Sequence, residues 1–280
     1  MIFRLLSSAV ILPAWVALMF KAPLAFRLII FGCILIGAEE YRRLWTAKKL
    51  GYQPWLTHTA LTLLLLPAAL GPNLLPPGTT FHLRPLEGLW MMSLIFCTAT
   101  ASAIFRPREK DLPLRLLAEV LGVLYLAVPG LCIYALMGQA SYGSWWVFLI
   151  FWYAWIYDAA ALFVGKAWGR TKLNALSPAK TFEGLWGGMA LTAVLSALIL
   201  PLVLPQGFPF GRLGLALFAL PASAMAQAGD LFESMLKRYA KVKDSSRLIK
   251  AHGGFLDKMD SSLFLAPLML ALAALAGWVR

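Results

Sequence analysis

The sequence predicts an all-α, polytopic integral membrane protein with about nine transmembrane helices. Three observations support this prediction. Hydrophobic residues make up 60% of the 280 residues and charged residues only 14%, whereas a soluble domain has roughly 45–50% and about 25%. The apolar residues form runs close to the ~20 residues that a helix needs to cross a bilayer. These runs lack the alternation of an outer-membrane barrel, and their hydrophobicity excludes a disordered chain.

The predicted spans follow one another closely along the chain. The first, residues 5–20, resembles a signal peptide, but no small-residue cleavage site follows it, so we interpret it as a membrane helix. The next span, 24–39, forms a close hairpin with the first. A turn-rich outer loop, Gly71–Gly88, separates the third span from the fourth. The remaining predictions place spans at 57–72, 89–105, 114–137, 145–165, 184–204, 209–228 and 260–278.

The basic residues predict the orientation of these spans. With the N-terminus inside and the C-terminus outside, only five of the 25 Lys and Arg residues lie outside: Lys21, Arg27, Arg84, Arg212 and Arg280. Cytoplasmic loops carry such an excess of positive charge, and an even number of spans would remove the asymmetry. We therefore interpret the net charge of +12 as contact with anionic lipid or phosphate, not with nucleic acid.

The two halves of the chain differ in their acidic residues. Residues 1–140 are apolar helices with plain basic loops, and we expect them to form a scaffold and dimerisation region. Residues 141–280 are expected to form the catalytic region, with an active site at the cytoplasmic face. This half carries seven of the 13 acidic residues, all at or near the predicted inner face: Asp158, Glu183, Asp230, Glu233, Asp244, Asp257 and Asp260.

One of these acids, Asp158, stands inside the apolar run Trp145–Val164. A carboxylate at that depth costs at least ~2.5–3.5 kcal/mol, so it is expected to face a polar cavity or a cation. The alternative is an interfacial Asp near the inner end of a tilted helix.

The segment Ser177–Gly184 joins the sixth and seventh spans and permits two interpretations. Ser or Thr can cap the following helix, with Glu183 near its first turn. Alternatively, backbone N–H groups at the helix N-terminus and Lys180 form a cradle for an anionic phosphate.

The richest segment is Gln227–Ser262. If Gly229–Ala240 is helical, then Asp230, Ser234 and Lys237 share one face. The alternative is a basic juxtamembrane helix in which Glu233 and Lys237 form a surface ion pair.

The acids that follow in this segment predict a metal site. Asp257 and Asp260 stand one helical turn apart, after the turn His252-Gly253-Gly254. Together with Asp230 they predict a divalent-cation site, although acids near a helix N-terminus also suit the helix dipole. Carboxylate oxygens favour Mg²⁺, and the whole pattern is typical of phosphoryl or nucleotidyl transfer.

This segment resembles the signature of the phosphatidate cytidylyltransferases, also called CDP-diacylglycerol synthases. The matching residues are Ser234, Leu236, Lys237, Arg238, Lys243, Asp244, Ser246, Ile249, His252, Gly253, Gly254, Asp257 and Asp260. Upstream, the resemblance includes Asp158, Gly165, Gly169, Ser177-Pro178, Lys180-Thr181, Glu183-Gly184 and Gly187-Gly188, so that it covers about residues 154–262. Two positions depart from the family: Lys250 replaces Pro or Gly, and Lys258 replaces Arg.

The resemblance implies an enzyme of phospholipid biosynthesis in a bacterial-type inner membrane, with its active site facing the cytoplasm. It would join phosphatidic acid to CTP and release pyrophosphate, with Mg²⁺ and room for a second cation. A homodimer is one expected assembly, and nucleic acid is not an expected partner. The implied catalytic residues are Lys237, Arg238, Lys243, Asp244 and His252; the substrate-binding residues are Asp158, Ser177, Lys180, Thr181, Glu183, Ser234, Gly253 and Gly254; and the metal ligands are Asp230, Asp257 and Asp260.

Several alternatives remain open at this point. The chain could be a related CTP-dependent enzyme that acts on another lipid phosphate or a lipid alcohol. It could also be an inactive, lipid-binding paralogue, given Lys250 and Lys258. A transporter or lipid-binding scaffold is the alternative from another class, but its ionisable residues would be spread along a pathway and not gathered at one face.

Overall fold

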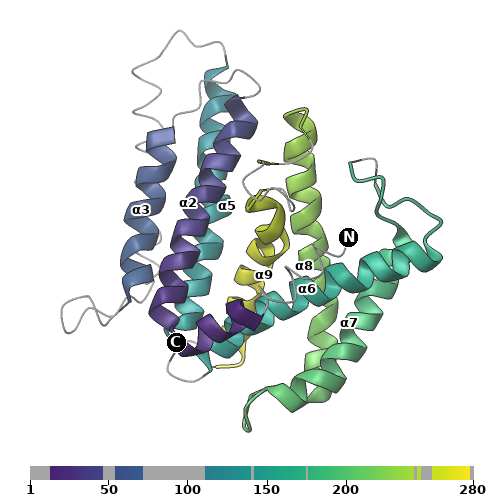
Figure 1. Cartoon of the computed structure of the whole chain (residues 1–280). Coiled ribbons are helices and arrows are strands. Elements are labelled where there is room, and N and C mark those ends of the chain that lie inside the picture. Colours follow the sequence, from purple (N-terminus) through teal and green to yellow (C-terminus); the bar gives the residue numbers. More distant parts are fainter. Residues whose placement is uncertain are drawn as a thin grey trace. The chain divides into compact units, whose positions relative to one another are not determined.

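The computed structural model describes residues 13–46, 54–71, 111–139, 142–174, 176–242, 245–246 and 254–277. These ranges are helical apart from short connections and one isolated bridge between Lys172 and Thr181. The all-α prediction is therefore confirmed. The labelled helices of Figure 1 are α2 (Pro23–Thr46), α3 (Pro54–Leu70), α5 (Leu112–Met137), α6 (Gly143–Trp168), α7 (Phe182–Val203), α8 (Arg212–Tyr239) and α9 (Leu256–Leu275).

Five of the described helices, α5 to α9, are long and apolar enough to cross a membrane. Each overlaps a predicted span, and α3 contains a shorter apolar stretch, Thr57–Leu70. The chain is thus an integral membrane protein. The predicted span 89–105 and most of the span 5–20 lie outside the described residues. The count of nine spans and the orientation of the termini remain predictions.

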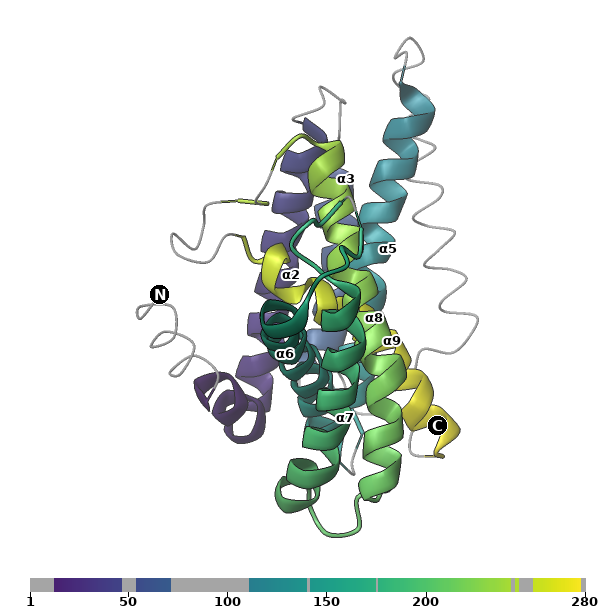
Figure 2. The same ribbon diagram turned by 90° about the vertical axis from the view of Figure 1, so that its right-hand side faces the viewer.

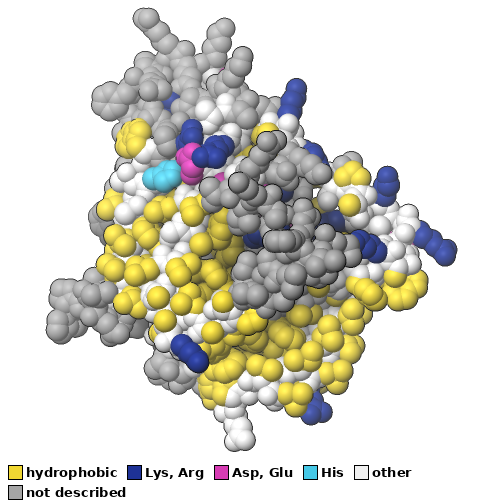
Figure 3. Space-filling model, in the orientation of Figure 1, with side chains coloured by type: hydrophobic (Ala, Val, Ile, Leu, Met, Phe, Trp, Pro, Cys, Tyr) yellow, Lys and Arg dark blue, Asp and Glu magenta, His cyan; other side chains and the backbone are white. Residues whose placement is uncertain are grey.

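The surface of these helices supports the same conclusion. Large apolar side chains are exposed along α7 and α8, with Leu202 at 79% and Leu213 at 72%. Figure 3 shows apolar side chains over a large part of the described surface on the side drawn. A patch of this extent is unfavourable in water, whereas lipid tails solvate it.

The chain folds as two compact units, and the first comprises residues 1–138 and 239–257. Its helices α2, α3 and α5 pack on one another (Figure 1). The Tyr41 hydroxyl on α2 donates to the Ala118 carbonyl on α5 at 2.9 Å. A Cβ added to Gly130 of α5 would lie 2.8 Å from Ile34 Cδ1 and 3.0 Å from Leu65 Cδ2, so this glycine allows three helices to meet.

The second unit comprises residues 139–238 and 258–280. Its helix α6 is tied to α8 by the Tyr153 hydroxyl, which donates to the Leu215 carbonyl at 2.9 Å. The α8 and α9 helices lie next to each other (Figure 2), where the rings of Phe232 and Phe264 pack 5.4 Å apart. The Ser261 hydroxyl also donates to the Ala226 carbonyl at 3.1 Å, which fixes the register of α9 on α8.

A glycine of α7 lies directly against the backbone of α6. A Cβ added to Gly188 would lie 2.9 Å from Ala161 Cα and 3.0 Å from its backbone nitrogen. Because the obstacle is backbone, a side-chain rotation cannot relieve it.

We expect Gly188→Ala to separate α6 from α7 and to lower the free energy of unfolding by about 1–3 kcal/mol, the usual cost of overpacking. Thermal unfolding of the detergent-solubilised protein measures this effect. Gly32→Ala is the matched control, because an added Cβ at this helical glycine meets nothing within 4 Å. Equal unfolding temperatures for the two variants would contradict the close packing.

The predicted span 209–228 and the helix considered for Gly229–Ala240 belong to one helix, because α8 runs without a break from Arg212 to Tyr239. Its 28 residues extend about 42 Å at about 1.5 Å per residue, longer than the ~30 Å hydrocarbon core. The reason is that Gly229 is helical and packs against α9 and does not end the helix. The acidic and basic residues of α8 therefore stand on a rigid continuation of an apolar helix.

Candidate active site

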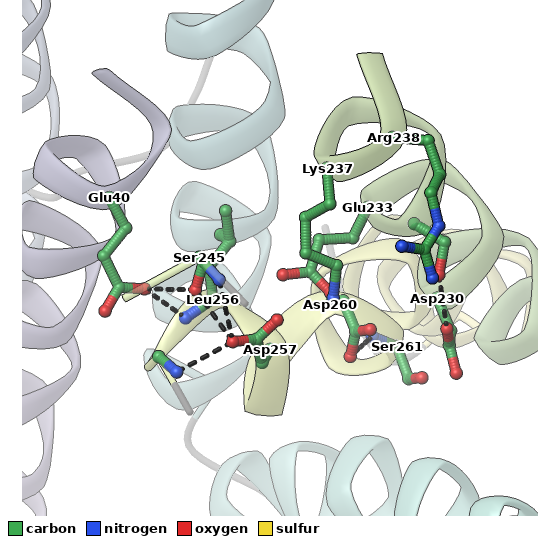
Figure 4. A network of polar contacts seen from close by, with 12 residues as sticks. Glu40, Asp230, Glu233, Lys237, Arg238, Ser245, Leu256, Asp257, Asp260 and Ser261 are labelled. Carbon is green, nitrogen blue, oxygen red and sulfur yellow. Dashed lines mark hydrogen bonds and ion pairs between the residues drawn. The ribbon is translucent and has the colours of Figure 1, made fainter. Parts of the chain in front are cut away.

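The C-terminal half of α8 presents its polar residues in pairs one turn apart. The Ser234 hydroxyl donates to Asp230 Oδ1 at 3.3 Å, which confirms that these residues share a helix face. Lys237 Nζ lies 2.9 Å from Glu233 Oε2 (Figure 4). The Glu233 side chain is only 1% exposed, so this ion pair is not the surface pair of the alternative interpretation.

The connection between α6 and α7 is fastened onto α8 by two contacts within the second unit. The Lys180 ammonium forms an ion pair with the Asp230 carboxylate. Arg238 Nε donates to the Leu176 carbonyl at 3.2 Å. The half-buried Ser177 shapes this loop, because its carbonyl accepts the Lys180 backbone N–H at 3.0 Å. The structure thus brings together two segments that the sequence analysis had singled out separately.

Thr181 and Glu183 hold the start of α7. The Thr181 hydroxyl accepts the Gly184 backbone N–H at 3.1 Å, which confirms that this residue caps the helix. The Glu183 carboxylate accepts the backbone N–H groups of Arg170 and Thr171, each at 3.1 Å to Oε2. These contacts close the loop on itself. The predicted phosphate cradle at the same place remains a prediction.

Three carboxylates of the second unit, Asp158, Asp230 and Asp260, lie within electrostatic range of one another. Asp158 is exposed on α6, whereas Asp260 on α9 is 7% exposed and also interacts with the side chain of Glu233. Neighbouring carboxylates repel one another when all are ionised, so the cluster is stable only when protons or cations reduce its negative charge. The ammonium groups of Lys180 and Lys258 offset part of the charge near Asp158.

A glycine sets the separation of Asp230 and Asp260. A Cβ added to Gly229, the residue before Asp230, would run into the Asp260 backbone carbonyl and lie 3.2 Å from Phe264 Cβ. The two helices therefore meet at the level of these two acids.

The chemistry of this cluster suits a hard cation. Among the residues that the structure describes, no three His, Cys, Asp or Glu side chains are arranged to hold a metal ion. Mg²⁺, however, usually takes one or two carboxylates and completes its shell with water and substrate phosphates. A carboxylate pair such as Asp230 and Asp260 fits that requirement.

A second polar network lies in the first unit and includes the third predicted metal ligand, Asp257. Its Oδ2 accepts the Ser245 backbone N–H at 3.1 Å, the Ser245 hydroxyl at 2.9 Å and the Gly254 backbone N–H at 2.7 Å. Asp257 therefore stands in a fixed position in the first turn of α9, one turn before Asp260 (Figure 4).

The same network contains two residues that the sequence analysis missed, Glu40 and Ser245. Glu40 is 2% exposed and accepts the Ser245 hydroxyl at 3.1 Å, across 205 residues of sequence. The signal in the sequence is the acidic pair Glu39-Glu40 at the end of the predicted span 24–39. That signal identifies neither which of the two acids is buried nor its partner.

Four predicted site residues, Lys243, Asp244, His252 and Gly253, lie outside the described residues. Their roles remain predictions. Gly254 is described, and a Cβ added there would meet the Ser245 hydroxyl and lie 2.7 and 2.8 Å from the two Glu40 carboxylate oxygens. The missing side chain at Gly254 thus allows the backbone to approach Glu40. Its predicted contact with substrate remains a prediction.

Comparison with known proteins finds similarity along almost the whole chain. The profile of the Cytidylyltransferase family matches residues 2–276. A phosphatidate cytidylyltransferase of Staphylococcus epidermidis is 30% identical over 270 residues, which cover 95% of this chain and 96% of that protein. A Bacillus subtilis phosphatidate cytidylyltransferase is 43% identical over 136 residues, or 48% of this chain and 49% of its own. A phosphatidate cytidylyltransferase of Synechocystis is 46% identical over 118 residues, which cover 41% of this chain and 38% of that protein.

Proposed function

Because the chain belongs to the cytidylyltransferase family, we propose that it transfers the cytidylyl group of CTP to phosphatidic acid, which yields CDP-diacylglycerol and pyrophosphate. It is an integral membrane nucleotidyltransferase of phospholipid biosynthesis. The observation that carries the proposal is the Lys180–Asp230 ion pair. This contact joins the two polar segments of the second unit, so that cations and carboxylates stand together as phosphoryl chemistry requires.

The proposed reaction is an in-line displacement at the α-phosphorus of CTP. A phosphate oxygen of phosphatidic acid forms the new P–O bond, and the bond to the bridging oxygen breaks. The electron pair of that bond leaves with pyrophosphate. Because phosphatidic acid is already an anion, the attack requires no strong general base. Mg²⁺, when bound, neutralises charge on the triphosphate and on the departing pyrophosphate.

The residues of the chain have distinct tasks in this proposal. The proposed metal ligands are Asp230, Asp257 and Asp260, and oxygen donors of this kind suit Mg²⁺ and a second cation. Positive charge near the transferred group lowers the barrier because negative charge accumulates there. The residues proposed to supply or orient that charge are Lys237, Arg238, Lys243, Asp244 and His252. The residues proposed to hold the lipid phosphate or the nucleotide are Asp158, Ser177, Lys180, Thr181, Glu183, Ser234, Gly253 and Gly254.

The membrane topology is part of the proposal. Nine spans with the N-terminus inside would place the basic loops and the site at the cytoplasmic face of a bacterial inner membrane. Lipid substrate would then enter sideways from the bilayer, and CTP from the cytoplasm. Residues 1–140 would act as scaffold and as the dimer contact. Cysteine labelling of Arg84 and Lys172 variants from each side of the membrane tests the orientation.

The reaction itself can be tested with the full chain in detergent. We expect incubation with phosphatidic acid, CTP labelled at the α-phosphorus and Mg²⁺ to yield labelled CDP-diacylglycerol and an equal amount of pyrophosphate. Diacylglycerol and an isoprenoid phosphate serve as rival acceptors, and the Asp230→Asn variant supplies the background rate. Release of CDP in place of pyrophosphate would indicate a CTP-dependent lipid kinase. A folded protein without turnover on any acceptor would support the lipid-binding alternative.

A further inference from the structure

The Glu40 carboxylate of α2 is buried and surrounded by donors from one distant segment. Its Oε1 accepts the Ser246 hydroxyl at 2.5 Å and the Phe255 backbone N–H at 3.0 Å. Its Oε2 accepts the Leu256 backbone N–H at 2.7 Å and the Ser245 hydroxyl at 3.1 Å. A carboxylate at 2% exposure is stable only with such partners. Glu40 therefore fixes both ends of the stretch that leads into α9.

Ser245 links this carboxylate to Asp257. Its hydroxyl lies 3.1 Å from Glu40 Oε2 and 2.9 Å from Asp257 Oδ2 (Figure 4). The hydroxyl has a single hydrogen, which the two carboxylates share. The Ser245 backbone N–H also donates to Asp257 Oδ2, at 3.1 Å, so Ser245 is held to Asp257 by two hydrogen bonds. A movement of Glu40 would thus be transmitted to Asp257 through one buried residue.

The backbone of the segment is built for this contact. Gly254 donates its N–H to Asp257, while its Cα faces the Glu40 carboxylate so closely that a side chain would collide. One glycine therefore serves both acids.

We infer that Glu40 is a positioning residue for nucleotidyl transfer, which holds Ser245 and residues 254–256 so that the Asp257 carboxylate is presented in one orientation. The inference rests on the proposed function, because Asp257 is the reacting-site group that Glu40 serves. Partners that orient a ligand carboxylate typically contribute about 10–100-fold to metal affinity.

The test compares Glu40→Gln with Glu39→Gln. Both variants lose one negative charge at neighbouring positions of α2, but Glu39 faces Arg42 and Arg43 and its side chain is 34% exposed. We expect Glu40→Gln to weaken Mn²⁺ binding, measured by electron paramagnetic resonance without substrates, about tenfold or more. The Mg²⁺ concentration for half-maximal turnover should rise by the same factor. Glu39→Gln should stay within about twofold of the wild type, because the Glu39 carboxylate is paired with Arg42 and Arg43 on its own helix.

A double-mutant cycle separates positioning from general stabilisation. Glu40→Gln and Ser245→Ala act on the same carboxylate, so the double variant should bind Mn²⁺ no more than about twofold more weakly than the worse single variant. Additive losses, or unchanged Mn²⁺ affinity with a lowered unfolding temperature, would reject the positioning role. If the wild type failed to turn over phosphatidic acid and CTP but Glu40→Gln still weakened Mn²⁺ binding, the positioning role would stand and the proposed function would fail.

Discussion

Replacing Asp230 by asparagine is expected to lower pyrophosphate release at least about 10³-fold, equivalent to about 4 kcal/mol of transition-state stabilisation. Three interactions meet at this carboxylate: the ion pair with Lys180, the hydrogen bond from Ser234 and the charge interaction with Asp260. Asparagine keeps the size but loses the charge that a cation requires. The measurement is the initial rate across a Mg²⁺ titration with saturating CTP and phosphatidic acid.

The control for this variant is Asp111→Asn. Asp111 precedes α5, is exposed, and makes no capping hydrogen bond with its side chain. Its variant should retain the wild-type rate. Thermal unfolding in detergent should show both proteins folded. Near-normal turnover of Asp230→Asn at any Mg²⁺ concentration would remove Asp230 from the proposed metal site.

Gly229→Ala is expected to abolish most of the activity without touching a charged group. The added Cβ would run into the Asp260 backbone carbonyl, so α8 and α9 must move apart where they carry Asp230 and Asp260. Displacing an acid by about 1 Å can cost about 10²-fold in rate. The overpacking itself should lower the free energy of unfolding by about 1–3 kcal/mol.

Gly211→Ala provides the comparison, because a Cβ at this position just before α8 meets nothing within 4 Å. It should match the wild type in rate and in unfolding temperature. Activity and unfolding temperature measured together on the two variants check the prediction. A Gly229→Ala protein with the wild-type rate would show that the spacing of the two helices does not control the reaction.

The sequence by itself determined that the chain lies in a lipid bilayer, that its fold is all-α and that it belongs to this family. Apolar length is a local property, so the runs that became α5, α6, α7 and α9 could be located to within a few residues. The family signature is likewise a contiguous pattern, and the similarity across residues 2–276 agrees with it. Capping by Thr181 was also readable, because a cap bonds within its own first turn.

Only the tertiary structure decided which of these residues meet. The ion pair of Lys180 with Asp230 joins the connection between α6 and α7 to α8, and the contact of Glu40 with Ser245 spans 205 residues. The spacing of Glu233 and Lys237 predicted a pair, but not that the carboxylate would be buried. The physical reason is that burial and long-range pairing depend on how closely segments distant in the sequence pack against one another. At Gly188, Gly229 and Gly254 that closeness is set by the absence of a side chain, and its effect is visible only once the opposite backbone is in place.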